Sequence, residues 1–213
     1  MSVPKVSLPV IRRLPRYYRY ITDLQNNGVA KVSSGQLAKI MGSTPSQVRQ
    51  DFNCFGGFGQ QGVGYSVNVL KAEIEKLIFP GRELKAVLIG VGNLGVTIAN
   101  FVQKEDTGVN LVALFDDDST IIGNRLYGLE ILPVNKLEEF CKNNHVDIII
   151  ACTPKEAAEE LAPAIVATGV KGIWNYTHFD FGLYDDSLIV ENVHLRDNLM
   201  ALAYRINHKE NEQ

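Results

Sequence analysis

Apolar side chains recur at helical spacing through the first part of the chain, and turn residues interrupt them. The first such segment runs from Pro9 to Gln25 and ends at Asn26-Asn27-Gly28, where Asn and Gly favour a helix end. Two shorter segments follow, residues 33–41 and 43–52, separated by Gly42 and each opened by hydroxyl side chains that cap helices. A long helix followed by two short helices across a tight turn predicts a helix-turn-helix.

The residues that follow these helices break the helical pattern. CFGGFGQQGVGY, residues 54–65, places five glycines among aromatic side chains and predicts a tight hairpin. A further helical pattern extends from Ser66 to Ile78, and Pro80-Gly81 ends it. A hairpin after a helix-turn-helix is typical of the wing of a winged-helix domain, which we assign to residues 1–82.

From Lys85 onward, short apolar runs alternate with helical segments. The run VDIIIAC, residues 146–152, is almost continuously apolar, which is typical of a strand buried on both faces of a parallel sheet. We expect strands at Lys85–Ile89, Asn110–Phe115, Leu129–Leu132, Asp147–Ala151, Gly172–Asn175 and Ser187–Val190. We expect helices at Leu94–Gln103, Pro133–Cys141, Pro154–Thr168 and His194–Ile206. This alternation predicts an α/β Rossmann-type domain with a parallel sheet over residues 83–193, followed by a C-terminal helix and tail at residues 194–213.

Charge is distributed unequally between these parts. The chain as a whole has a net charge of −3, but residues 1–82 carry 11 Lys and Arg against 4 Asp and Glu, a net of +7. Residues 83–213 carry 10 against 20, a net of −10. This asymmetry favours a basic module that binds a polyanion, joined to an acidic module that does not.

Other features of the sequence argue against several classes of protein. No apolar run is long enough to span a membrane, and arginines from Arg12 to Arg19 occupy the place where a signal peptide would be apolar. The cysteines, Cys54, Cys141 and Cys152, lie in unlike contexts, which favours free thiols in a reducing compartment. We therefore expect a cytoplasmic protein without a membrane segment or a metal site.

The motif GVGNLG, residues 90–95, lies between a predicted strand and a predicted helix. Such a turn binds the pyrophosphate of a dinucleotide through backbone N–H groups at the helix N-terminus. Gly90 allows the tight turn, Gly92 allows the backbone to approach the phosphates, and Gly95 allows the helix to pack on the strand. We expect cofactor contacts at Gly90, Val91, Gly92, Asn93, Leu94 and Gly95.

An acidic residue ends the strand that follows this motif. Asp116 lies 21 residues after Gly95, where a carboxylate accepts hydrogen bonds from the adenosine ribose hydroxyls. Asp117 and Asp118 add negative charge that would repel a 2′-phosphate, so NADH and NAD+ are favoured over NADPH and NADP+. Further cofactor contacts are expected at the carboxyl edge of the sheet, at Thr153, Pro154 and Asn175.

The sequence offers little for catalysis. His178 is the only histidine predicted at the carboxyl edge of the sheet, and no Tyr-x-x-x-Lys pair of the short-chain dehydrogenase type is present. The chain also leaves no room for a substrate-binding domain. We therefore expect a protein that is not an enzyme. A small NAD-dependent oxidoreductase with an accessory helical domain is the alternative.

Four segments of the sequence together resemble the Rex family of bacterial redox-sensing transcriptional repressors. They are QVRQDFNCFGGFGQQGVGY (47–65), the GVGNLG turn, CTPKEAA (152–158) and VKGIWN (170–175), and the resemblance covers nearly the whole chain. It implies a homodimer whose winged helices bind palindromic operator DNA. It also implies Rossmann domains that sense the NADH/NAD+ ratio, with NADH releasing the DNA.

DNA contacts are expected in the predicted winged helix. Gln47, Arg49 and Gln50 stand near the start of the third helix, where side chains reach base edges; Arg favours guanine and Gln favours adenine. Phosphate contacts are expected from the hydroxyl residues Ser33, Ser34, Ser43, Thr44 and Ser46. Positive charge is expected from Arg12, Arg13 and Arg16, and wing contacts from Gln60 and Gln61. Many family members have a basic residue where this chain has Gln61.

The predicted C-terminal helix has an apolar face. Leu195, Leu199, Leu202 and Ile206 recur at helical spacing, and such a face must be buried. Packing on the sheet of the same chain is one alternative. The resemblance favours insertion between the two domains of a partner subunit, which is a domain-swapped arrangement.

Overall fold

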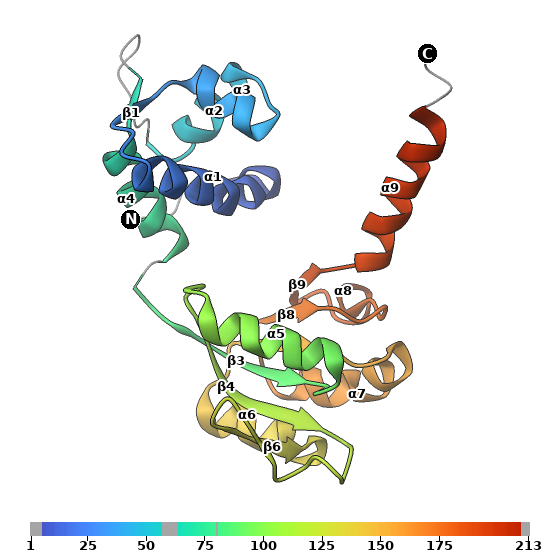
Figure 1. Cartoon of the computed structure of the whole chain (residues 1–213). Coiled ribbons are helices and arrows are strands. Elements are labelled where there is room, and N and C mark those ends of the chain that lie inside the picture. Colours follow the sequence, from blue (N-terminus) through green and yellow to red (C-terminus); the bar gives the residue numbers. More distant parts are fainter. Residues whose placement is uncertain (1–5, 57–63, 80, 210–213) are drawn as a thin grey trace. The chain divides into compact units, whose positions relative to one another are not determined.

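The computed structural model describes residues 6–56, 64–79 and 81–209 (Figure 1). The chain divides into two compact units, the first ending at Arg82 and the second beginning at Glu83. Each unit has its own hydrophobic core. Among the helices of the described residues, none is both long and apolar enough to cross a lipid bilayer.

Helices and a short two-stranded ribbon make up the described part of the first unit. They are α1 (Leu8–Asn26), β1 (Lys31–Val32), α2 (Ser34–Met41), α3 (Pro45–Asn53), β2 (Tyr65–Ser66) and α4 (Val67–Ile78). β1 pairs antiparallel with β2, so that Val32 lies opposite Tyr65. The helix-turn-helix predicted from the sequence is confirmed, with each helix boundary within two residues of its expected place. The tip of the predicted wing, residues 57–63, lies outside the described residues.

Capping residues set the boundaries of α2 and α3. The hydroxyl oxygen of Ser33 accepts a hydrogen bond from the N–H of Gln36 at 3.1 Å, and Gln36 Oε1 accepts one from the N–H of Ser33 at 2.8 Å. Gly42 ends α2 in the left-handed conformation, with φ of 63°. Thr44 caps α3, because its Oγ1 accepts a hydrogen bond from the N–H of Gln47 at 3.2 Å. The turn between the two helices is therefore encoded locally.

The core of the first unit fixes α3 against α1. Tyr17 of α1 and Phe52 of α3 have almost no exposed surface, and their ring centroids lie 4.9 Å apart. The ring of Tyr65 packs edge-on against Phe52 at 5.1 Å. Fully burying a large apolar side chain stabilises a fold by about 1.5–3 kcal/mol, so these contacts hold the helix firmly.

A seven-stranded sheet forms the centre of the second unit within the described residues. Its strands are β3 (Leu84–Ile89), β4 (Val109–Asp116), β5 (Arg125–Leu126), β6 (Leu129–Pro133), β7 (Ile148–Ala151), β8 (Gly172–Asn175) and β9 (Ile189–Asn192). Their order is β5-β6-β4-β3-β7-β8-β9, and neighbouring strands are parallel except for β5 and β6. Ile89 pairs with Phe115 on one side and Ala151 on the other, so the carboxyl ends of these strands meet at one edge.

Helices cover both faces of the central strands (Figure 1). The helical elements of this unit are α5 (Asn93–Lys104), η1 (Val134–Lys136), α6 (Leu137–Asn144), α7 (Lys155–Ala167), α8 (Phe181–Tyr184) and α9 (Leu195–Lys209). Val87 and Ile89 of β3 pack with side chains of α6 and α7, whereas Ala86 and Leu88 pack with Ala99 of α5. Burial on both faces explains the continuously apolar strands and confirms the predicted parallel-sheet fold.

Three predicted elements of this unit were wrong at their boundaries, and one of them is the C-terminal helix, which was expected to end at Ile206 but continues to Lys209. The helix expected at Pro133–Cys141 begins later, because Pro133 ends β6 and the turn η1 precedes α6. The strand expected at Ser187–Val190 also begins later, because Asp185 Oδ1 accepts a hydrogen bond from the N–H of Ser187 at 2.8 Å and forms a turn. α8 and β5 were missed, since such short elements carry no readable periodicity.

Candidate functional site

The turn between β3 and α5 carries the glycine motif, and its glycines differ in their surroundings. Gly90 has a φ of 91°, and a Cβ there would lie 2.9 Å from the carbonyl group of Cys152. A Cβ at Gly95 would overlap the carbonyl oxygen of Gly90, so only glycine lets α5 begin this close to the strand. Gly92, the N-cap of α5, has open space around it. The turn therefore combines a tight reversal with an accessible helix N-terminus, which suits a phosphate.

Asp116 ends β4 beside this turn. Its Oδ2 accepts a hydrogen bond from the N–H of Val91 at 2.6 Å, and its Oδ1 accepts one from the N–H of Asp118 at 2.9 Å. Hydrogen bonds from the hydroxyl group and the N–H of Thr120 lower the pKa of the exposed Asp118 carboxyl. The loop after β4 therefore presents negative charge next to the glycine turn at neutral pH.

A cavity of about 370 Å³ opens at this carboxyl edge of the sheet. Its lining includes Gly90, Gly92, Asp116, Thr153 and Pro154, each of which the sequence predicted as a cofactor contact. The lining does not include the other predicted residues of the turn, namely Val91, Asn93, Leu94 and Gly95. Of these, Val91 and Gly95 are buried beneath the turn, and Asn93 and Leu94 begin α5.

Several lining residues of this cavity were not predicted. Val134 comes from η1, and Ala157 and Leu161 come from α7. Apolar side chains of this kind flank the flat rings of bound ligands, but the sequence does not distinguish them from ordinary core residues. Cys152 also lines the cavity, and burial raises the pKa of its thiol to about 12, so the sulfur is neutral and unreactive there.

Asn175 ends β8 but has no exposed surface. Its Nδ2 donates to the carbonyl oxygen of Phe179 at 2.8 Å and to Asn192 Oδ1 at 2.7 Å. Its Oδ1 accepts hydrogen bonds from the N–H of Thr177 at 3.0 Å and from the Thr177 hydroxyl at 2.7 Å. These hydrogen bonds give Asn175 a structural role, which is to shape the loop after β8, and the cofactor contact expected at Asn175 stays a prediction.

His178, the histidine predicted at this edge, is exposed on that loop. Its ring centroid lies 5.8 Å from that of His194, and His194 Nδ1 lies 3.2 Å from Asp197 Oδ2. Over the described part of the chain, no group of three or more His, Cys, Asp or Glu side chains is arranged to hold a metal ion.

A second candidate surface lies on α2 and α3. Arg49 and Gln50 are exposed on α3, and Arg49 Nη1 donates a hydrogen bond to the Ser34 hydroxyl at 3.1 Å. The exposed residues Ser33, Thr44 and Ser46 lie at the N-termini of α2 and α3, whereas Ser43 is half-buried. Exposed hydroxyl groups and helix N-termini next to an oriented guanidinium suit contacts with DNA phosphates and bases.

Basic side chains are also exposed on α1. Arg12 and Arg16, which are expected from the sequence to supply positive charge to DNA, are exposed. The Arg16 guanidinium lies 5.8 Å from the ring centroid of Tyr20, and that of Arg19 lies 5.2 Å from it. The predicted wing contacts Gln60 and Gln61 lie outside the described residues.

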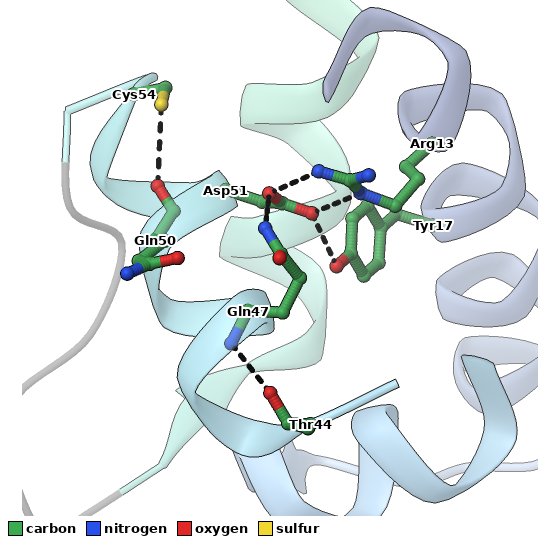
Figure 2. A network of polar contacts seen from close by, with 7 residues as sticks. All are labelled: Arg13, Tyr17, Thr44, Gln47, Gln50, Asp51 and Cys54. Carbon is green, nitrogen blue, oxygen red and sulfur yellow. Dashed lines mark hydrogen bonds and ion pairs between the residues drawn. The ribbon is translucent and has the colours of Figure 1, made fainter. Parts of the chain in front are cut away.

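Arg13 and Gln47 have a different environment (Figure 2). Arg13 Nε lies 2.6 Å from Asp51 Oδ2 and Arg13 Nη2 lies 2.8 Å from Asp51 Oδ1. Gln47 Nε2 also donates to Oδ1, at 2.8 Å, and the Tyr17 hydroxyl donates to Oδ2 at 2.9 Å. The Asp51 side chain is 1% exposed. The guanidinium of Arg13, a residue expected to supply positive charge to DNA, thus pairs with a buried carboxylate, and its contact with DNA stays a prediction.

The ionisation of this network follows from its contacts. Burial by itself raises the pKa of the Asp51 carboxyl, but hydrogen bonds from Arg13, Gln47 and Tyr17 together hold that pKa below its usual value. The hydrogen bond to Asp51 raises the pKa of the Arg13 guanidinium. Burial, and next the bond to Asp51, raise the pKa of the Tyr17 hydroxyl. At neutral pH, Asp51 is therefore an anion surrounded by donors.

Comparisons with known proteins match a family to each of the two units. The family described as "Putative DNA-binding protein N-terminus" matches residues 5–53, and the family described as "CoA binding domain" matches residues 82–179. A helix-turn-helix joined to a nucleotide-binding sheet defines a DNA-binding regulator that responds to a nucleotide.

Relatives of nearly the same length identify the family. The redox-sensing transcriptional repressor Rex of Caldicellulosiruptor saccharolyticus is 48% identical over 204 residues, which cover 96% of this chain and 93% of that protein. The repressor of the same name from Clostridioides difficile is 45% identical over 199 residues, which cover 93% of this chain and 94% of that protein. The chain therefore belongs to the Rex family of redox-sensing transcriptional repressors. Because these relatives are repressors and not enzymes, the oxidoreductase alternative is not supported.

Solved structures of a Rex-family repressor, RSP, are also similar. RSP in complex with β-NAD+ and operator DNA has a TM-score of 0.89 and 43% identity, covering 96% of this chain and 94% of that chain. RSP in complex with β-NADH has a TM-score of 0.87 and 41% identity, covering 97% and 96%.

Proposed function

We propose that this protein is a transcriptional repressor that binds operator DNA and is released from it by NADH. The observation that carries the proposal is the similarity, over nearly the whole chain, to RSP bound to β-NAD+ and operator DNA and to RSP bound to β-NADH. The two candidate surfaces of this chain support the proposal, because one suits DNA and the other suits a nucleotide. Because operator DNA and the NADH pool meet in the cytoplasm, we place the protein there.

The cavity at the glycine turn is the proposed nucleotide site. The N-terminus of α5 at Gly92 would bind the pyrophosphate, and Asp116 would accept hydrogen bonds from the adenosine ribose. Thr153 and Pro154 line the same cavity. We propose that the remaining turn residues, Val91, Asn93, Leu94 and Gly95, act through the backbone, either by binding phosphate or by shaping the turn.

The acidic loop after β4 determines which nucleotide fits. Asp117 and Asp118 are exposed beside Asp116, so a phosphate on the adenosine ribose would meet like charge. NADPH carries a 2′-phosphate and coenzyme A carries a 3′-phosphate, and both are therefore disfavoured relative to NADH and NAD+. NAD(H) is therefore the proposed ligand, although one matching family is described as a CoA binding domain.

The exposed side chains of the first unit are the proposed DNA surface. Arg49 and Gln50 would reach base edges from α3, and Arg12 and Arg16 would face phosphates from α1. Further phosphate contacts are proposed for Ser33, Ser34, Ser43, Thr44 and Ser46. The wing residues Gln60 and Gln61 complete the proposed set.

We propose that the functional unit is a homodimer. The apolar face of α9 is uncovered in the single chain: Leu195, Leu199, Leu202 and Ile206 are 59%, 67%, 52% and 61% exposed. An apolar groove of about 390 Å³, lined in part by Phe101 and Trp174, is a second uncovered surface. A second copy of the chain would bury these surfaces, with α9 exchanged between the subunits.

A DNA-selection experiment with and without NADH tests the proposal. We expect a palindromic sequence to be selected, with half-site centres about 10 bp or a multiple apart, and NADH to reduce its recovery. NAD+ and NADPH at the same concentration are the matched controls. Selection that is unchanged by NADH would reject the sensing role, and no selection at all would reject the repressor.

A further inference from the structure

We propose that Asp51 is a positioning residue that determines which base group Gln47 recognises. The inference rests on the proposed operator binding and adds a specificity determinant to it. Asp51 itself is buried and does not face DNA. Its effect is transmitted through the side chain of Gln47, one helical turn earlier in α3 (Figure 2).

The carboxylate of Asp51 joins two helices. Its Oδ2 accepts hydrogen bonds from Arg13 and Tyr17 of α1, at 2.6 and 2.9 Å. Its Oδ1 accepts one from Arg13 and one from Gln47, each at 2.8 Å. Because a buried charge is stable only when its acceptor sites are filled, the arrangement has little freedom to rearrange. The network thus fixes α3 on α1 and holds the Gln47 side chain in one orientation.

The polarity of the Gln47 amide follows from its partner. An ionised carboxylate only accepts hydrogen bonds, so Gln47 must turn its NH₂ group toward Asp51. The amide oxygen then faces away from Asp51, as Figure 2 shows. A glutamine without such a partner presents either its donor or its acceptor to a ligand. In this orientation, the group that Gln47 offers to a ligand is its amide oxygen, which accepts hydrogen bonds.

Gln47 lies where the orientation of its amide affects which base groups it can bind. Gln47 lies in the first turn of α3, and the N-terminal residues of a recognition helix contact base edges in the major groove. The groups there that donate to an acceptor are the exocyclic amino groups of adenine and cytosine. We therefore assign Gln47 to one such amino group. An unheld glutamine would also bind guanine O6 or thymine O4.

Base analogues in the selected operator test this assignment directly. At each adenine or cytosine, an analogue without the exocyclic amino group replaces the natural base, and the Kd of the full-length protein is measured. For one position in each half-site we expect the loss of the amino group to weaken binding about three- to tenfold. Gln47→Leu should show no effect of the analogue at that position.

A variant without the network separates positioning from stability. Combining Arg13→Met, Tyr17→Phe and Asp51→Leu replaces the buried polar groups by apolar side chains of similar size, which cores often tolerate. We expect this variant to bind the natural and the amino-deleted operator with Kd values within about twofold of each other. Tyr17→Phe alone is the matched control: it loses one hydrogen bond but keeps the bond between Gln47 and Asp51. It should lower Tm and keep the full sensitivity to the analogue.

The possible outcomes separate this inference from the proposed function. Full sensitivity in the variant without the network would overturn the role of Asp51. A Gln47-dependent position that responds to loss of guanine O6 or thymine O4, and not to loss of an amino group, would overturn it as well. This second measurement needs only the wild-type protein and Gln47→Leu. It therefore tests the orientation of Gln47 even if the triple variant does not fold. A protein that selects no operator sequence would instead reject the proposed function, and this inference with it.

Discussion

Asp116 combines a structural contact with the proposed ribose contact. Replacing it by Asn leaves one oxygen to accept a hydrogen bond but removes the charge and one acceptor, so we expect NADH binding to weaken by about 1–3 kcal/mol. The ratio of the Kd for NADPH to the Kd for NADH should decrease at the same time. Titration followed by the emission of Trp174, the only tryptophan, measures both. Asp186→Asn, an exposed acid outside the cavity lining, is the matched control. Unchanged discrimination in Asp116→Asn would contradict the proposed site.

Arg49 is the residue of α3 whose loss should change base preference most clearly. It is exposed and oriented by Ser34, and an arginine pairs with guanine through two hydrogen bonds. We expect Arg49→Ala to weaken operator binding by about 1–3 kcal/mol and to relax the preference at one base position. Arg16→Ala should instead weaken binding to all sequences and reduce the salt dependence. Equal effects of both variants on base preference would show that α3 has been misassigned.

The Asp51 network also predicts a dependence of stability on acidity. Because the pKa of Asp51 is lowered in the folded state, its contribution is complete above the unfolded pKa of about 4 and is lost as the pH falls further. Asp51→Asn should lower the free energy of unfolding by about 1–3 kcal/mol near neutral pH. The difference from the wild type should shrink in acid. Urea unfolding at neutral and acid pH measures it, and a constant difference would argue against an ionised Asp51.

Among the described residues, none covers the apolar face of α9. A substitution on this face therefore separates assembly from folding. Leu199 is 67% exposed, so Leu199→Asp should leave the subunit folded but disrupt the proposed dimer. Asn198→Asp adds the same charge at the neighbouring exposed position and is the control. We expect sedimentation to show a monomer, and operator binding to weaken, for Leu199→Asp alone. A stable Leu199→Asp dimer would place the dimer contact elsewhere.

In the whole molecule, the proposed function couples two ligands through one protein. If NADH binds better to the state that does not bind DNA, linkage requires operator DNA to weaken NADH binding by the same factor. A few kcal/mol of differential affinity moves most of the population from one state to the other. Titrations of NADH with and without operator, and of operator with and without NADH, give the two factors. Unequal factors would show that the proposed two-state coupling is incomplete.

Features that depend on neighbours along the chain could be predicted from the amino-acid sequence alone. The cap at Thr44, the reciprocal bonds at Ser33 and the left-handed Gly42 each involve residues a few positions apart, so the residue types indicate the geometry. The apolar strands could be predicted equally well, because strands that are buried on both faces carry few polar side chains. The helix-turn-helix, the parallel sheet and the nucleotide turn were predictable for this reason.

Which of the predicted side chains are available to a ligand depends instead on contacts between segments that are distant in the sequence. Arg13 is paired with Asp51, a residue 38 positions away. The polar atoms of Asn175 form hydrogen bonds with the loop after β8 and with Asn192, 17 positions away. Leu161 enters the cavity from α7, although its sequence context is that of any helix facing a core. The partner of a side chain depends on which distant segments the fold brings together. The local sequence pattern therefore does not predict it.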